Sequence, residues 1–167
     1  MPAIRVVLIA AASRNGVLAA EGKIPWHLPR DVAHFRARTA GRWLLLGRTT
    51  YEQMAGWFQP GQVPVVLTRR SGYVVPGGWV VPSVAAALAL AGSHGAAELV
   101  VCGGGQVYQA ALPFADEVIL TTVDTDVPGG IRFPPLPPDQ WTVRQQESFP
   151  ADAANRWPIT ITRHVRR

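Results

Sequence analysis

The chain has 167 residues, of which 48% are hydrophobic and 16% are charged, and this balance excludes an intrinsically disordered protein. The single cysteine, Cys102, excludes a disulfide framework and a multi-cysteine zinc site. The formal net charge is +5, and because Lys23 is the only lysine, arginine carries the positive charge. Arginine binds carboxylates and phosphates in a planar, bidentate manner, so the composition indicates an anionic partner without separating nucleic acids from small molecules.

The N-terminal segment superficially resembles a signal peptide, because Arg5 precedes a short apolar run over residues 6–12. The run is at the short limit for such a signal, and its branched residues are equally typical of a buried strand, which is our interpretation. No other apolar run approaches the roughly 18 residues of a membrane span. We therefore expect a cytoplasmic protein without a membrane partner.

Short β-rich runs alternate with helical patterns along the chain. Strands are predicted over residues 4–12, 43–46, 63–68, 79–81, 98–101 and 117–123, with helices over 30–39, 49–54, 84–91 and 106–112. Gly41 is expected to end the first helix, Ser83 to cap the third, and Gly92 to end that third helix. Residues 13–29 and 127–138 are predicted to be loops.

Residues 141–149 and 159–165 are predicted to form a terminal antiparallel hairpin. Alternation of strands and helices favours a mainly parallel sheet, because parallel strands need crossover connections. The sequence therefore predicts an α/β fold, a single domain over residues 1–167, with a mostly parallel central sheet flanked by helices and the hairpin at its edge.

Three glycines, residues 103–105, separate a predicted strand from a helix. Such a turn lets a phosphate approach backbone N–H groups, but it also suits a tight turn that needs positive φ. Arg48, Arg69 and Arg70 follow other predicted strands. Together they suit a polyanionic cofactor with an additional ribose phosphate. Each arginine alone is equally consistent with a solvent-exposed charge at the edge of the sheet.

Residues 22–31 carry the most informative pattern. Asp31 falls in the first turn of a predicted helix, where a carboxylate can serve as a cap. Trp26, Leu28 and Phe35 are expected to place it beside an aromatic, apolar wall. Desolvation there disfavours the charged form, an arrangement typical of proton chemistry.

The remaining reactive residue types give no further motif. His27 and His34 are interpreted as surface histidines, and Cys102 as a small buried apolar group. The sequence contains no zinc-ligand cluster, G-x-S-x-G motif or Walker motif, so neither a metal site nor hydrolase or NTPase chemistry is predicted.

Four segments, residues 24–31 with Phe35, 47–50, 101–108 and 120–121, resemble the dihydrofolate reductase family, in order and over essentially the whole chain. The resemblance implies hydride transfer from NADPH to C6 of a dihydropterin or dihydrofolate, with protonation at N5. It implies a small-molecule substrate rather than a nucleic acid, and we expect a monomer.

The resemblance also implies roles for individual residues. Asp31 is the implied active-site carboxylate, Thr121 shares its network, Trp26 positions a water and Tyr108 lies near the nicotinamide. The implied substrate-binding residues are Ile9, Ala11, Leu28, Phe35, Arg36, Met54 and Gln62. The implied cofactor-binding residues are Ala11, Leu18, Gly47, Arg48, Thr49, Thr50, Thr68, Arg69, Cys102, Gly103, Gly104, Gly105, Gln106 and Val107. The loop before Trp26 is the implied mobile lid.

Three positions depart from the family pattern. Gln62 occupies the place of an arginine that clamps the glutamate α-carboxylate of folate, a loss expected to weaken binding roughly tenfold to hundredfold. Arg36 is expected to compensate in part. Ala19 stands in the lid where a glycine is usual, and Gln106 replaces an arginine after the glycine turn.

Two alternatives remain open. Gln62 favours a reductase of the same fold that acts on another heterocycle, such as the pyrimidine intermediate of riboflavin synthesis, although residues 25–31 disfavour it. Arg163, Arg166 and Arg167 suggest a nucleic-acid binder, although the other arginines are scattered along the chain.

Overall fold

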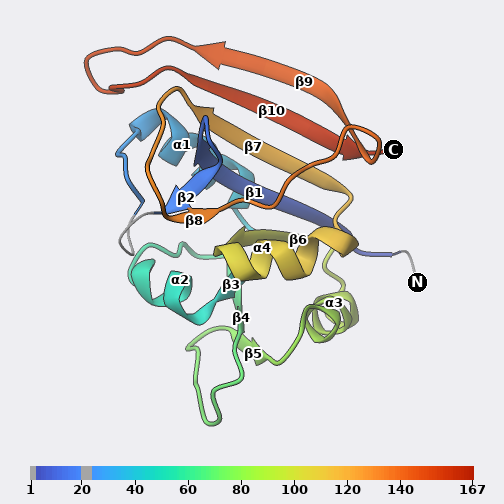
Figure 1. Cartoon of the computed structure of the whole chain (residues 1–167). Helices are drawn as coiled ribbons and strands as arrows, with labels where there is room; N and C mark the ends of the chain where they lie inside the picture. The colour runs from blue at the N-terminus through green and yellow to red at the C-terminus, as the bar shows by residue number, and fades with distance from the viewer. Residues whose placement is uncertain (1–2, 20–23) are drawn as a thin grey trace.

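The computed structural model describes residues 3–19 and 24–167, and within them an eight-stranded sheet has the order β5-β4-β3-β6-β1-β7-β10-β9 (Figure 1). The strands of this sheet are β1 (Arg5–Ser13), β3 (Trp43–Gly47), β4 (Val63–Leu67), β5 (Trp79–Val81), β6 (Glu98–Gly103), β7 (Glu117–Val123), β9 (Trp141–Phe149) and β10 (Ile159–Arg166). The helices are α1 (Pro29–Thr39), α2 (Arg48–Gln53), α3 (Val84–Ser93) and α4 (Gly105–Ala111), with a 3₁₀ turn over Leu112–Phe114.

Every pairing from β5 across to β7 is parallel, and β10 pairs antiparallel with both β7 and β9. The hairpin β9–β10 therefore forms one edge of the sheet, above β7 in Figure 1. This arrangement confirms the predicted α/β fold with a mostly parallel sheet and a terminal antiparallel hairpin.

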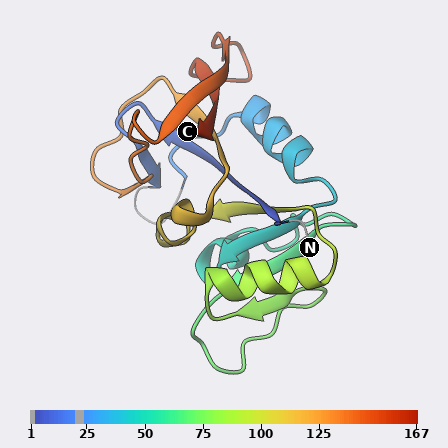
Figure 2. The same cartoon turned by 90° about the vertical axis from the view of Figure 1, so that its right-hand side faces the viewer.

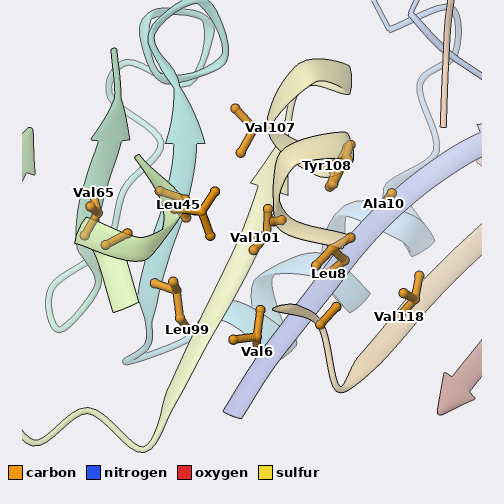
Figure 3. Close-up of a cluster of buried hydrophobic side chains, with 14 of the residues drawn as sticks. Val6, Leu8, Ala10, Leu45, Val65, Leu99, Val101, Val107, Tyr108 and Val118 are labelled. Carbon is orange, nitrogen blue, oxygen red and sulfur yellow. The ribbon is translucent and has the colours of Figure 1, made fainter. Parts of the chain in front are cut away.

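Alternate residues of the central strands point to opposite faces of the sheet, because side chains alternate along a strand. On one face Val6, Leu8 and Val101 pack against α3 and α4, and Figure 3 shows them beside Val107 and Tyr108 of α4. On the other face Val7, Ile9 and Cys102 pack against side chains of α1 and α2. Burial on both faces explains why these strands are continuous apolar runs.

Two short strands that the sequence analysis placed in loops form a second sheet. β2 (Val17–Ala19) pairs antiparallel with β8 (Ile131–Arg132). Strands of three and two residues are too short for a hydrophobic period to appear in the sequence, so the prediction of loops was wrong at these positions. The pairing brings residues 17–19 beside the Pro/Gly-rich segment near β7 (Figure 1).

The predicted end of α3 was also wrong, whereas its start is confirmed. The Ser83 hydroxyl accepts a hydrogen bond from the Ala86 amide, as a helix N-cap does. Gly92 lies inside the helix, which continues to Ser93, and the positive φ belongs to Gly95. Several small residues follow one another here, so the sequence offers more than one candidate C-terminus.

The segment considered as a signal peptide forms β1, between β6 and β7 in the sheet. The C-terminal arginines bind this chain's own acceptors: Arg163 pairs with Glu117, and Arg166 donates to the Leu112 and Ala115 carbonyls. Both termini are marked in Figure 2. Within the described ranges, no helix is long and apolar enough to cross a membrane.

Candidate active site

A cavity of about 1510 Å³ opens where β1, β3, β4 and β6 end and α1, α2 and α4 begin. The carboxyl ends of parallel strands are the usual place for a ligand site in such sheets. The predicted site residues that line it are Ile9, Ala11, Leu18, Trp26, Asp31, Phe35, Gly47, Arg48, Thr49, Thr50, Met54, Thr68, Arg69, Cys102, Gly103, Gly104, Gly105, Gln106, Val107 and Tyr108. The structure therefore brings most of the predicted set together around one cavity.

Asp31 lies in the first turn of α1 and faces this cavity. Burial raises the pKa of its carboxyl group, and a hydrogen bond with the Thr121 side chain and the charge of His34 partly oppose that shift. Thr121 is itself buried, on β7 opposite Ala11 of β1. The arrangement gives a carboxylate that takes up a proton more readily than an exposed aspartate does.

An aromatic wall lies on the same side of the cavity. Phe35, one helical turn beyond Asp31, packs against Trp57 with ring centroids 5.1 Å apart, and Trp26 also lines the cavity. Trp57 was not predicted as a site residue, although its position among other aromatic residues after α2 could have indicated one. A flat ligand ring fits beside such a wall.

The glycine turn closes the opposite side. Gly103 has φ +119°, and a Cβ there would lie 3.3 Å from the Tyr108 ring, so this position favours glycine. A Cβ on Gly104 would lie 3.3 Å from Thr50 Oγ1, which places the turn against the start of α2. The Tyr108 hydroxyl donates a 2.6 Å hydrogen bond to the Ile9 carbonyl, joining α4 to β1.

Cations gather at the far end of the cavity, where β3 and β4 end. Arg48 and Arg69 both line this end with Thr68. Arg48 Nη1 is 3.2 Å from both Glu52 carboxylate oxygens, and the Tyr73 hydroxyl donates to the same carboxylate. Arg69 is exposed, so its guanidinium is accessible to an anionic ligand group.

Cys102 agrees with its interpretation as a buried apolar group, since it is 8% exposed and burial raises its thiol pKa far above the ordinary value. A metal site was not predicted. Across residues 3–19 and 24–167, no group of three or more His, Cys, Asp or Glu side chains is placed to hold a metal ion.

Four predicted site residues lie outside the cavity lining, namely Leu28, Arg36, Gln62 and Thr121. Leu28 is buried in a small core with Val123 and Ile159, so its assignment to substrate binding is corrected. Thr121 reaches the site through Asp31.

Gln62 is the second correction to the predicted substrate-binding set. Its amide nitrogen donates to Thr39 at 3.2–3.3 Å, and its amide oxygen accepts from the Gln59 backbone at 2.8 Å. A buried amide needs such partners, so Gln62 ties the C-terminus of α1 to the turn before β4 rather than facing the cavity.

His34 departs from its interpretation as a surface histidine. It is half-buried and lines the cavity one turn after Asp31. Arg36 is exposed, with its guanidinium carbon 5.4 Å from the centroid of the Trp57 ring. His27 is exposed, as predicted.

The implied lid falls only partly within the described residues. Leu18 lines the cavity, and Ala19 lies in β2 opposite Ile131 of β8. Residues 20–23 of the predicted loop lie outside the described residues. Ile24, on the far side of that gap, is exposed and lines the cavity.

A sequence model of the family described as "Dihydrofolate reductase" matches residues 5–166. The chain belongs to the dihydrofolate reductase family. Among curated relatives, the type 3 dihydrofolate reductase of Salmonella typhimurium is 37% identical over 161 residues, covering 95% of this chain and 98% of that protein. A dihydrofolate reductase of Mycobacterium tuberculosis is 38% identical over 140 residues, covering 81% and 83%.

A solved dihydrofolate reductase from Enterococcus faecalis, in complex with NADP(H) and a compound named RAB-propyl, superimposes with a TM-score of 0.88. It is 29% identical and covers 98% of this chain and 96% of its own. The dihydrofolate reductase fold therefore extends over both the parallel sheet and the terminal hairpin.

Proposed function

We propose that the protein reduces 7,8-dihydrofolate to tetrahydrofolate with NADPH. The observation that carries the proposal is the half-buried carboxylate of Asp31, held by Thr121 beside an aromatic wall, in the same cavity as the glycine turn and two arginines. The family match and the relatives' names support it. They do not favour the pyrimidine reductase alternative.

The residues around the glycine turn fit a dinucleotide with phosphate groups. Glycine at residues 103–105 lets a diphosphate approach the backbone of the turn, and Arg48, Thr68 and Arg69, which line the same cavity, suit a ribose phosphate. NADPH supplies the hydride when it is bound there. Tyr108, next to the turn, fixes the wall of the cavity through its bond to Ile9.

Asp31 and its neighbours act on the substrate. The carboxylate accepts hydrogen bonds from the N3–H and 2-amino groups of a pterin ring, and its charge favours the protonated form of the substrate at N5. Thr121 orients the carboxylate, while Phe35 and Trp57 pack on the flat ring. The protein thus supplies orientation and charge, and the cofactor supplies the reducing equivalent.

The glutamate tail of folate requires a cation, and Gln62 does not provide one. Arg36 is the cation that we assign to this tail, because its guanidinium stacks on Trp57, which lines the cavity beside Phe35. The charge stays accessible to a carboxylate, and the ring contact limits the freedom of its side chain.

The deciding assay follows NADPH oxidation with dihydrofolate at neutral pH. We expect turnover by the wild type and a rate about 100-fold or more lower in Asp31→Asn, because asparagine keeps the shape of the side chain but lacks its negative charge. His27→Gln, an exposed neighbour outside the cavity, is the matched control. No turnover by folded wild type with dihydrofolate would refute the proposed substrate.

We also propose that the chain is one domain, monomeric and cytoplasmic. The continuous sheet from β5 to β9 supports a single folding unit. Gel filtration with light scattering tests the monomer directly.

A further inference from the structure

A second cavity of about 750 Å³ adjoins the first and is here termed the back cavity. Its charged lining comes from five strands and α1, and consists of Arg5, Arg38, Glu98, Glu117, Glu147 and Arg163. His34 lines both the back cavity and the substrate cavity. The imidazole therefore stands between Asp31 and a cluster of charges that the proposed reaction does not use.

Three buried polar atoms at this boundary make no protein hydrogen bond within the described residues, namely His34 Nε2, Arg38 Nε and Glu98 Oε1. Glu98 Oε1 is nevertheless ion-paired, at 3.8 Å from Arg38 and 3.7 Å from Arg42. Buried polar atoms in a polar cavity of this size are satisfied by water. His34 is consequently in contact with a hydrated, charged space on one side and with the substrate cavity on the other.

Asp31 and His34 interact through charge. They are three residues apart on α1, a spacing that places side chains about 5–6 Å apart on one helix face. Burial lowers the pKa of His34, Asp31 and Glu147 act to raise it, and Arg38 lowers it further. Because burial raises the pKa of Asp31, the two groups titrate closer together than free side chains would, and each affects the other.

We propose that His34 is a positioning residue that couples the charge state of Asp31 to the charged groups of the back cavity. An imidazolium at His34 favours the carboxylate form of Asp31, and loss of that positive charge favours the carboxylic acid. Glu147 on β9 holds the positive charge on His34, while Arg38 opposes it. The inference rests on the proposed function only in naming Asp31 as the substrate-binding carboxylate.

The coupling can be measured without substrate. NMR titration of the histidine ring signals, in wild type and in Asp31→Asn, follows His34 directly. We expect the His34 midpoint to fall by about 0.5 to 2 pH units in the variant, from Coulomb's law at about 6 Å with an effective dielectric of 80 to 20. His164, which lines neither cavity, is the internal control, and its midpoint should be the same in both proteins. An unchanged His34 midpoint overturns the proposal, whether or not the enzyme reduces dihydrofolate.

Kinetics of His34→Gln and Glu147→Gln supply the second test. His34→Gln removes the imidazolium beside Asp31, so the acid limb of the kcat/KM profile should move to higher pH. Glu147→Gln removes a carboxylate that favours this imidazolium, so the acid limb should move in the same direction by a smaller amount. Above about pH 8, where a neutral imidazole carries no charge, kcat/KM should stay within about twofold of wild type. If the role of His34 were merely structural, kcat/KM would fall by the same factor at every pH and the acid limb would not move. That result would contradict the proposal.

Discussion

Asp31 combines burial with a specific hydrogen-bond partner, and the two act in opposite directions on its pKa. Burial penalises the carboxylate, whereas Thr121 and His34 stabilise it. The net upward shift means that the native state holds a proton more tightly than the unfolded chain does. The ionised carboxylate therefore costs stability at neutral pH while it serves the substrate.

Asp31→Asn should accordingly be more stable than wild type at pH 7. As the pH falls toward the ordinary aspartate pKa of 3.8, the wild-type carboxyl group takes up its proton and the difference should shrink. Calorimetric Tm values at pH 7 and pH 4 check the prediction. A variant that is less stable at pH 7, or a difference independent of pH, would be inconsistent with a raised pKa.

Arg36 gives a prediction on substrate recognition. Arg36→Gln should raise KM for dihydrofolate about tenfold, because a charged hydrogen bond contributes about 1.5–3 kcal/mol and this site is exposed. The variant should leave kcat nearly unchanged and should not affect a dihydropterin that lacks the glutamate tail. Arg156→Gln is a matched control, since that arginine also stacks on a tryptophan, Trp157, which unlike Trp57 does not line the cavity. Equal effects on both substrates would exclude a tail contact.

Among the elements, α4 and β1 are joined at the site by one buried contact. The Tyr108 hydroxyl bonds to the Ile9 carbonyl, and Gly103 lies under the Tyr108 ring, so the glycine turn and the helix support each other. The same elements carry the packed core shown in Figure 3. The strand and the helix thus hold the glycine turn at the edge of the cavity.

Tyr108→Phe should lower the free energy of unfolding by about 1–3 kcal/mol, because it leaves the buried Ile9 carbonyl without its donor. Tyr73→Phe removes an exposed hydroxyl that donates to Glu52, and it should change stability by less than about 0.5 kcal/mol. Urea unfolding of both variants provides the comparison. If both variants changed the free energy of unfolding by a similarly small amount, the hydrogen bond of Tyr108 would not stabilise the fold significantly.

Three strands were predicted with their observed bounds, namely the buried β7 and the edge strands β5 and β9. Runs such as Glu117–Val123 were predicted with their observed bounds, because continuous branched residues leave few alternatives. The pair β2–β8 could not be predicted, because its stability depends on contacts between segments more than a hundred residues apart.

Local patterns predicted Asp31 and the glycine turn, and the structure places both at the cavity. Gln62 and Leu28 lie away from the cavity, and His34, which was expected at the surface, lines it. Their environments depend on how α1 packs against the sheet and the turn before β4, which the local sequence does not specify.

Across the whole molecule, Glu117 of β7 links three strands. It is 3% exposed and forms ion pairs with Arg5 of β1 and Arg163 of β10, so it joins the parallel part of the sheet to the hairpin. Burial alone would raise the pKa of Glu117, but the two arginines outweigh burial and lower it. Its contribution to stability is therefore complete above the ordinary pKa of 4.5 and is lost as the pH falls further.

Glu117→Gln should cost about 1–3 kcal/mol of unfolding free energy at pH 7, a range that allows for the partial exposure of both arginines. The cost should diminish as the pH falls below the ordinary glutamate pKa of 4.5, because the carboxyl group takes up its proton in the unfolded chain first. The exposed Asp139→Asn is a control for the charge change. The free energy of unfolding of both proteins should be measured from pH 3 to pH 7. A decrease that is the same at every pH would contradict this role of Glu117.

Hydride transfer from NADPH to C6 of dihydrofolate, in the cavity that holds Asp31, can be followed directly with an isotope. The measurement uses NADPH deuterated at the transferred C4 position, and mass spectrometry with NMR of the product, for wild type and Asp31→Asn. We predict tetrahydrofolate with one deuterium at C6 from the wild type, formed about 100-fold or more slowly by the variant at neutral pH. Tetrahydrofolate without deuterium, or equal rates in the two proteins, would contradict the account.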